Sequence, residues 1–172
     1  MKFKMGEKGF TLVELLVGLS IAAFVVGAAS MTIITMMRLS PQTNNWAIAL
    51  RQVQNAGYWI SHDVQMAEIL TVEDPATLKF LTLIVPEWDP VSGAVVDRTL
   101  VYEFEDMPGG LQRLMRTNQD TGGQTMIAEY ISSAPPPIYN SGNRTLTFTI
   151  EATSGNVPVT RDYEAMQRVP AQ

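Results

Sequence analysis

The spacing of hydrophobic and polar positions changes twice along the chain. From Leu15 to Met37 there are 23 consecutive residues without a charge, and a helix needs about 20 residues to cross a bilayer core. From about Thr43 to Leu70 apolar residues recur at steps of three and four, which predicts an amphipathic helix. After Asp74-Pro75 the period falls to two, which is typical of strands.

The two helical segments are expected to be separated by a break or kink at Ser40-Pro41, since serine is a good N-cap and proline fits the first position of a helix. Polar positions of the second segment should face solvent or neighbouring molecules, and these are Arg51, Gln52, Asn55, His62 and Glu68. The apolar stripe should pack against the strands, and it comprises Trp46, Leu50, Val53, Gly57, Ile60, Val64 and Ala67.

Six segments carry the strand pattern, the last of them weakly: residues 77–85, 98–105, 110–117, 125–131, 144–151 and 157–163. Turns between them are indicated by Gly109-Gly110, Gly122-Gly123 and Ser141-Gly142-Asn143. The predicted fold class is α+β. A long N-terminal α-helix, membrane-spanning in its first half and amphipathic in its second, packs on an antiparallel β-sheet. Residues 38–172 form one exterior domain, with its helix at about 43–70 and its sheet at about 77–163.

A single charge, Glu14, interrupts the apolar N-terminal region, because Phe10 to Val13 are also apolar. A carboxylate in the middle of a membrane helix costs about 2.5–3.5 kcal/mol, so its presence calls for a partner or for contact with water at the interface. Cleavage after Gly9 would give Phe10 a free ammonium group four residues before Glu14. In a helix these charges share one face, about 6 Å apart along the axis, and either charge can pair within the chain or with a neighbouring copy.

The basic start of the chain, with Lys2, Lys4 and Lys8 against Glu7 alone, indicates a cytoplasmic N-terminus and an exterior C-terminal domain. A conventional signal peptide has a shorter apolar stretch of 7–15 residues followed by a small-residue cleavage site. The apolar run here is longer, so removal of the helix by ordinary signal cleavage is not expected.

The segment Lys8-Gly9-Phe10-Thr11-Leu12-Val13-Glu14, followed by a long apolar helix, resembles the class III signal of type IV pilins and of the pseudopilins of type II secretion systems. The resemblance implies that a membrane-embedded prepilin peptidase cuts between Gly9 and Phe10 and N-methylates Phe10. Residues 1–9 would then be a cleaved leader and residues 10–37 the transmembrane part of the N-terminal helix. It also implies that Glu14 recruits the subunit into a filament by pairing with the N-terminus of a neighbour.

The partners implied by this resemblance are other pilin or pseudopilin subunits, the prepilin peptidase, the inner-membrane assembly platform and the lipid bilayer. The chain would be a single-pass inner-membrane protein, and part of an extracytoplasmic filament after assembly. Residues 100–105 and 110–116 resemble the paired strands of minor pseudopilins of the J type, which favours a minor subunit. Secretion, motility, adhesion and DNA uptake all stay open as the system that it serves.

Small residues recur at four-residue steps in the apolar run, as Gly18 and Ala22 and as Ala23 and Gly27. This spacing allows close approach of helices in lipid. The alternative is that glycine and alanine are simply common in membrane helices.

From Arg38 onward there are nine Lys or Arg against fifteen Asp or Glu, a formal charge of −6. This charge argues against nucleic acid as a partner. The chain has no cysteine, which excludes disulfides and thiol chemistry.

Neither an enzyme nor a cofactor or metal site is expected. Ser61-His62-Asp63 has the residue types of a hydrolase triad, but adjacent helical residues point about 100° apart, so a solvated helix face is expected instead. Acidic residues near turns favour solvated loops, with calcium ligation as the alternative: Glu87, Asp89, Asp97, Asp106 and Asp120. The competing function is an anchored exterior binding domain or enzyme that does not polymerise.

Overall fold

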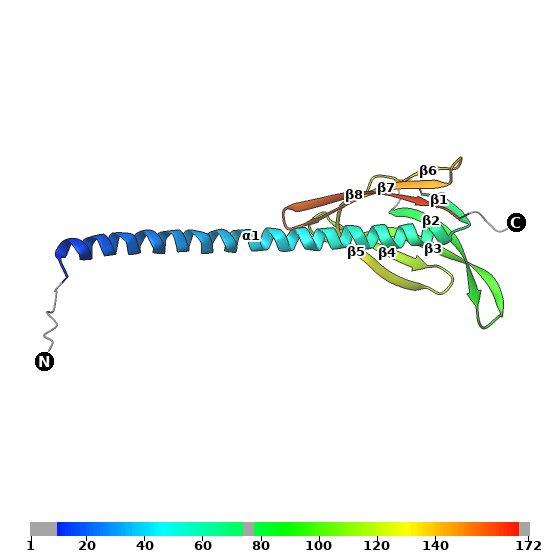
Figure 1. Cartoon of the computed structure of the whole chain (residues 1–172). Coiled ribbons are helices and arrows are strands. Elements are labelled where there is room, and N and C mark those ends of the chain that lie inside the picture. The colour runs from blue at the N-terminus through cyan, green and yellow to red at the C-terminus, as the bar shows by residue number, and fades with distance from the viewer. Residues whose placement is uncertain (1–9, 74–77, 169–172) are drawn as a thin grey trace, which may run out of the picture. The chain divides into compact units, whose positions relative to one another are not determined.

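The structure is a computed structural model that describes residues 10–73 and 78–168, so the predicted leader, residues 1–9, lies outside the described residues. Helix α1 spans Leu12–Met66. The chain forms two compact units, Met1–Gln42 and Thr43–Gln172, and α1 contributes residues to both (Figure 1).

Helix α1 continues through Pro41, so a break at Ser40-Pro41 is wrong, whereas the alternative, a kink, stays a prediction. A proline inside a helix removes one backbone donor and crowds the carbonyl of the residue four positions earlier, at a cost of about 3 kcal/mol. That cost is local. The residues on both sides of Pro41 remain helical, so the cap and proline signals do not mark an end.

Eight antiparallel strands follow the helix in the described residues, which confirms the predicted α+β class. The strand order is β1-β2-β3-β4-β5-β7-β6, and β8 also pairs with β7. Their bounds are β1 Ile69–Val72, β2 Lys79–Asp89, β3 Ala94–Asp106, β4 Gln112–Asn118, β5 Gly123–Ser133, β6 Ile138–Asn140, β7 Thr145–Ser154 and β8 Val157–Met166.

All six predicted strand segments are present, as β2, β3, β4, β5, β7 and β8. The two strands that were not predicted are short, four residues in β1 and three in β6, too short to show a clear period of two. Helix α1 ends at Met66 and not near Leu70, because Ile69 and Leu70 already pair with Ile84 and Leu83 of β2. The predicted glycine turns lie where the chain passes from β3 to β4, from β4 to β5 and from β6 to β7.

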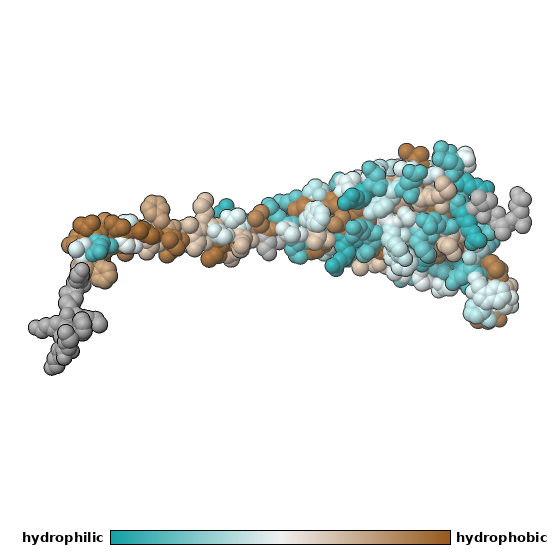
Figure 2. All heavy atoms as spheres, viewed as in Figure 1, coloured by the Kyte–Doolittle hydropathy of each residue, from teal (hydrophilic) through white to brown (hydrophobic). Residues whose placement is uncertain are grey.

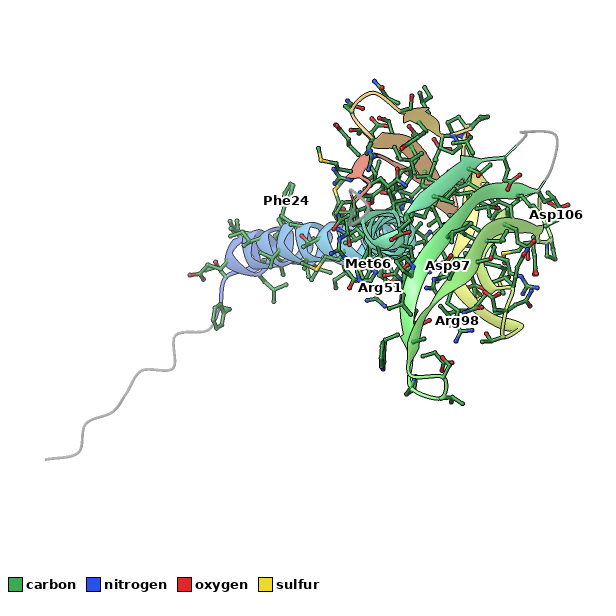
Figure 3. All side chains as sticks on the ribbon, turned by 90° about the vertical axis from the view of Figure 1, so that its right-hand side faces the viewer. Phe24, Arg51, Met66, Asp97, Arg98 and Asp106 are labelled. Atoms are coloured by element: carbon green, nitrogen blue, oxygen red, sulfur yellow. The ribbon has the colours of Figure 1, made fainter. Side chains whose placement is uncertain are left out.

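The core of the second unit lies between the sheet and the second half of α1, which Figure 3 shows end-on with the strands curving around it. The helix contributes a fully buried stripe of Ala49, Val53, Ala56, Ile60 and Val64, and Ala67, just past the helix end, is also fully buried. The predicted stripe is therefore confirmed in its second half. At its start it was wrong, since Trp46 is 48% exposed and Ala49 takes the inward position.

The helix approaches the sheet closely at Gly57. A Cβ atom placed on Gly57 would lie 2.2 Å from the ring of Tyr163, which stands on β8. The Tyr163 hydroxyl donates a hydrogen bond to the Val53 carbonyl at 3.0 Å, and its ring stacks on Phe148 of β7 with centroids 5.2 Å apart. Gly57 is thus required for its small size, which leaves room for the Tyr163 ring against the helix.

Candidate functional site

Helix α1 begins with a reciprocal cap made by Thr11 and Glu14. The Thr11 N–H and hydroxyl donate to Oε2 of Glu14 at 3.1 and 3.0 Å, and the Glu14 N–H donates to the Thr11 hydroxyl oxygen at 3.3 Å. This is the capping-box arrangement, in which a threonine N-cap and a glutamate three residues later satisfy the free donors of the first turn. Glu14 therefore has a local role in starting the helix.

Both bonds from Thr11 end on the same oxygen of Glu14. A carboxylate offers about four acceptor positions on its two oxygens. Within residues 10–73 and 78–168, no hydrogen bond ends on the other oxygen, Oε1. The carboxylate can therefore cap its own helix and still accept a donor from another molecule.

Glu14 shares one face of the helix with small residues. Phe10, Glu14, Leu15, Gly18, Leu19 and Ala22 line a single shallow hollow. A Cβ added at Gly18 would meet no heavy atom within 4 Å. This surface can therefore receive a neighbouring helix at short range.

Phe10 lies just before the helix, which begins at Leu12, so its four-residue step to Glu14 is not a helical step in the uncut chain. Its side chain is 87% exposed. Gly9, the other residue of the predicted cleavage site, lies outside the described residues.

The first half of α1 exposes almost only apolar side chains, visible as the brown stretch toward the N-terminus in Figure 2. Among the residues that the structure describes, α1 is the only helix long and apolar enough to cross a membrane, with a mean hydropathy of 2.3 in its most apolar window. Four hydroxyls in this region donate to carbonyls four residues earlier: Ser20, Ser30, Thr32 and Thr35. A helix that satisfies its own polar groups in this way is compatible with lipid.

Residues 4–30 match the family model of the prokaryotic N-terminal methylation motif. The methylation motif covers Gly9, Phe10 and Glu14 together with most of the apolar run. Comparison of the chain with curated proteins and with solved structures gave no match. The motif supports a pilin-type subunit and, together with the long apolar helix, anchoring in a membrane.

A second polar site, far from the methylation motif in sequence, lies between α1 and the sheet around Asp63. The Tyr102 hydroxyl and the Arg116 Nε both donate to Asp63 Oδ2 at 2.6 Å. Asp63 is 4% exposed, and the Arg116 guanidinium also lies over the ring of Trp59, 5.5 Å from its centroid. The expectation that Asp63 belongs to a solvated helix face is therefore wrong.

The electrostatics of this cluster follow from burial and from the Asp63 charge. Burial raises the pKa of Tyr102, and the neighbouring carboxylate adds to that shift by opposing a second negative charge. Burial alone would lower the pKa of Arg116, but its hydrogen bonds and charge attraction to Asp63 outweigh this, so the pKa is raised. Tyr102 is therefore neutral and Arg116 charged at any ordinary pH. The cluster joins α1 to β3 and β4.

The Ser61-His62-Asp63 sequence does not form a catalytic triad. His62 contacts Asp63, with 3.4 Å between Nδ1 and Oδ1, but its side chain is 54% exposed while that of Asp63 is turned into the protein. The Asp63 Oδ2 atom is occupied by Tyr102 and Arg116. The arrangement therefore does not hold an imidazole between a serine and a carboxylate.

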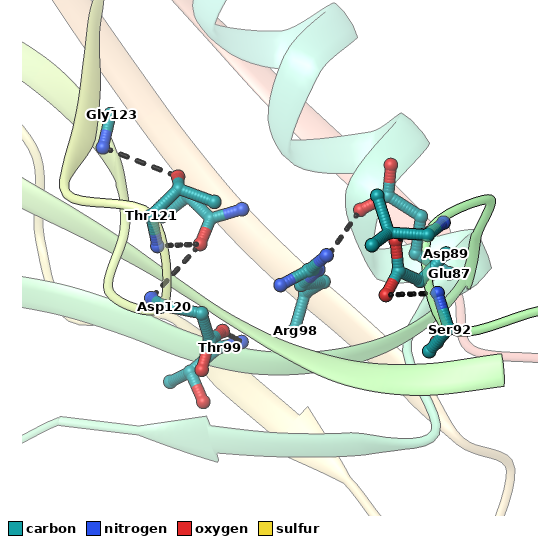
Figure 4. A network of polar contacts seen from close by, with 10 residues as sticks. Glu87, Asp89, Ser92, Arg98, Thr99, Asp120, Thr121 and Gly123 are labelled. Atoms are coloured by element: carbon teal, nitrogen blue, oxygen red, sulfur yellow. Dashed lines mark hydrogen bonds and ion pairs between the residues drawn. The ribbon is translucent and has the colours of Figure 1, made fainter. Parts of the chain in front are cut away.

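The acidic residues near turns mostly bond to nearby donors (Figure 4). Asp120 accepts the Thr99 N–H at 2.7 Å, Asp106 accepts from Gln112 at 3.0 Å, and Glu87 lies 3.5 Å from the Arg98 guanidinium. In the part of the chain that the structure describes, no three Asp, Glu or His side chains gather in a way that could hold a metal ion.

Asp63 was missed in the sequence although its position carried a signal. It lies three residues after Ile60 and four before Ala67, which places it on the buried stripe. A charged residue on a buried stripe requires partners from elsewhere in the fold. Tyr102 and Arg116 are those partners, and they lie opposite each other on β3 and β4.

Proposed function

We propose that the chain is a pilin-like structural subunit that is anchored by its N-terminal helix, cut between Gly9 and Phe10, N-methylated at Phe10 and assembled through that helix into a filament. Its basic start remains in the cytoplasm, and residues 38–172 lie outside the membrane. Its mechanism is association and not catalysis. The filament is a type IV pilus or a type II secretion pseudopilus.

The observation that carries this proposal is Glu14 within a matched methylation motif. The carboxylate stands in an apolar helix, on one face with Gly18 and Ala22, and its Oε1 atom can accept a further donor. The free ammonium group that cleavage would create on Phe10 of a neighbouring subunit is a donor of opposite charge. Such a pair in lipid would fix the register between subunits, because each unpaired charge is costly there.

The test is incorporation of the full-length Glu14→Ala chain into filaments in cells. We expect incorporation to fall by more than about tenfold while membrane insertion is retained, because removing a charge from a membrane helix favours insertion. Glu68→Ala is the matched control: Glu68 is also exposed but lies outside the apolar run. Incorporation of Glu14→Ala at the level of the parent would remove the assembly proposal and leave the anchored exterior domain as the better hypothesis.

Processing is tested separately by mass spectrometry of the mature N-terminus. We expect a chain that begins at Phe10 and carries a methyl group on its amine. A chain that begins at Met1, or at any residue other than Phe10, would contradict the proposed cleavage. A Gly9 substitution that blocks cleavage would serve as the reference for the uncut form.

We further propose that the subunit is minor and J-like. The supporting feature is the hairpin of β3 and β4, where Tyr102 lies opposite Arg116 in register and both bind Asp63. Quantitative mass spectrometry of purified filaments should then find this chain far below the most abundant subunit. An equal or greater abundance would make it a major subunit.

A further inference from the structure

The hairpin of β2 and β3 extends beyond the rest of the sheet. β1 pairs with β2 only as far as Ile84, and β4 pairs with β3 only from Leu100 onward. Between these points residues 85–98 pair only with each other, from Val85 opposite Arg98 to Asp89 opposite Ala94. Figure 1 shows this two-stranded ribbon projecting from the sheet.

The end of the ribbon exposes three apolar side chains. Trp88 and Val95 lie directly opposite each other and are 62% and 63% exposed, and Val91 in the turn is 93% exposed. Brown atoms are visible at this end in Figure 2. A pair such as Trp88 and Val95 supports the ribbon by about 0.2–1 kcal/mol, but Val91 has no such role in the fold.

The turn is held in place before any partner arrives. The Asp89 carboxylate accepts the N–H groups of Val91 and Ser92 at 3.1 and 3.2 Å, and the Gly93 N–H donates to the Asp89 carbonyl at 2.9 Å. Gly93 has a φ of 67°, which favours glycine. An element that is already ordered loses little conformational entropy on binding, so this turn is suited to present Val91 to a partner.

The charges of the ribbon indicate what chemistry the partner has. Residues 85–98 contain three carboxylates, Glu87, Asp89 and Asp97, and one cation, Arg98, which lies 3.5 Å from Glu87. An anionic lipid surface would repel this excess of negative charge. A second copy of the chain would do so as well, since its residues from Arg38 onward carry a formal charge of −6.

We propose that residues 85–98 are a docking ribbon, which inserts Val91 and Trp88 into an apolar pocket rimmed by Lys or Arg on a different protein. Apolar contact supplies the affinity. The carboxylates of the ribbon orient it against the basic residues of the partner and raise the rate of encounter. This contact is separate from assembly through Glu14. It adds a second surface by which the exterior unit selects a neighbour.

The experiment places a photo-crosslinking amino acid at position 91 of the full-length chain in cells, where the side chain is exposed and the fold is not disturbed. After illumination, the adduct is identified by mass spectrometry. We expect one protein, crosslinked at a segment that contains Lys or Arg. The matched control places the same amino acid at Ile138, which is also exposed, at 72%, but lies on β6.

The second arm combines the crosslinker at position 91 with Asp97→Lys, which reverses one charge beside the apolar end. We expect the yield of the adduct to fall by about fivefold or more. The proposal is overturned by the absence of an adduct, by adducts with lipid alone or with a second copy of this chain, by the same adduct from position 138, or by a yield that Asp97→Lys leaves unchanged. Incorporation of a Glu14→Ala chain into filaments is measured in parallel. It tests assembly through the helix separately from docking of the ribbon, so failure of one proposal is distinguished from failure of the other.

Discussion

Helix α1 carries two carboxylates whose surroundings are opposite. Glu14 lies in the first unit, where the side chains of the helix are exposed, and its hydrogen bonds come from Thr11 only three residues away. Asp63 lies in the second unit, buried, and its hydrogen bonds come from Tyr102 and Arg116 in distant strands. The fold therefore surrounds the Asp63 carboxylate with partners, whereas the Glu14 carboxylate keeps one oxygen available.

Under the proposed function, this difference distinguishes a residue that stabilises the fold from one that serves association. An ion pair that is completed within the chain contributes to stability but offers little to another molecule. A carboxylate capped on one oxygen, in an apolar helix that the chain itself does not cover, has binding capacity left for a neighbour. Loss of Asp63 should therefore reduce stability, whereas loss of Glu14 should reduce assembly.

The largest effect on stability is expected from Asp63→Ala. Removing one partner of a buried pair leaves Arg116 and the Tyr102 hydroxyl without their acceptor, at a cost of up to about 3–5 kcal/mol. Because the Arg116 side chain is 24% exposed and can regain water, we expect about 3 kcal/mol. Thermal unfolding of the full-length chain in detergent, followed by near-UV circular dichroism, measures this loss.

The matched comparison is Glu14→Ala in the same measurement. We expect it to lose at most about 1 kcal/mol, from its helix cap with Thr11, because Glu14 is exposed and lies away from the core. Equal losses in the two variants would remove the distinction between them.

The next effect contrasts two glycines of the same helix, Gly57 and Gly18. Alanine normally stabilises a helix relative to glycine by about 0.5–1 kcal/mol. At Gly57 its Cβ would lie 2.2 Å from the Tyr163 ring, so we expect Gly57→Ala to destabilise by about 2 kcal/mol. At Gly18 nothing lies within 4 Å, so Gly18→Ala should leave unfolding unchanged or slightly raise its temperature.

The pair of glycine variants also separates folding from assembly. For incorporation into filaments, we expect Gly18→Ala to have the larger effect of the two. Gly18 shares its helix face with Glu14, and a larger side chain there would keep a neighbouring helix at a distance. Gly18→Ala should thus lower incorporation without lowering stability. Normal incorporation of Gly18→Ala would show that this face is not used in packing.

The sequence was sufficient for the elements with a long, regular pattern and for the residues of a local motif. The apolar run of α1, the six longer strands and the methylation motif that contains Phe10 and Glu14 are all readable from neighbouring positions. Partners that the fold brings together are not readable in this way, and this is why Asp63 was assigned to solvent. Pro41 shows the opposite limit, because a strong local signal for a break is overridden by the helix on both sides.

Tyr102→Phe tests the buried site around Asp63 with a smaller change than Asp63→Ala. At pH 7 the variant loses the hydrogen bond to Asp63, and we expect a cost of about 1.5 kcal/mol. In the parent, the pKa of Tyr102 is raised above its ordinary value of 10.0 by burial, so the phenol is neutral in both states below pH 10. Above pH 10 only the unfolded state loses its proton, and the free energy of unfolding falls.

The pH dependence provides an independent check on burial. Since phenylalanine does not titrate, the difference in stability between the parent and Tyr102→Phe should narrow as the pH rises above 10, measured by denaturant unfolding. Tyr58→Phe is the control, because Tyr58, on α1, is also a tyrosine of the second unit but is 64% exposed. A difference that stays constant through this pH range would contradict the buried position of the hydroxyl.

The smallest effect is expected from Thr11→Val, which decides whether capping accounts for Glu14. The variant loses the two hydrogen bonds of the Thr11 hydroxyl but retains the bond from the Thr11 N–H, so the first turn should be weakened by about 0.5–1 kcal/mol. Faster amide hydrogen exchange at residues 12–15, in detergent, measures this weakening. Incorporation into filaments should remain, because the carboxylate that we propose to pair with a neighbour is still present. If Thr11→Val instead blocked incorporation as fully as Glu14→Ala, the role of Glu14 would be to start its own helix. Glu14 and Asp63 would then differ only in whether their hydrogen-bond partners lie nearby in the sequence or in distant strands.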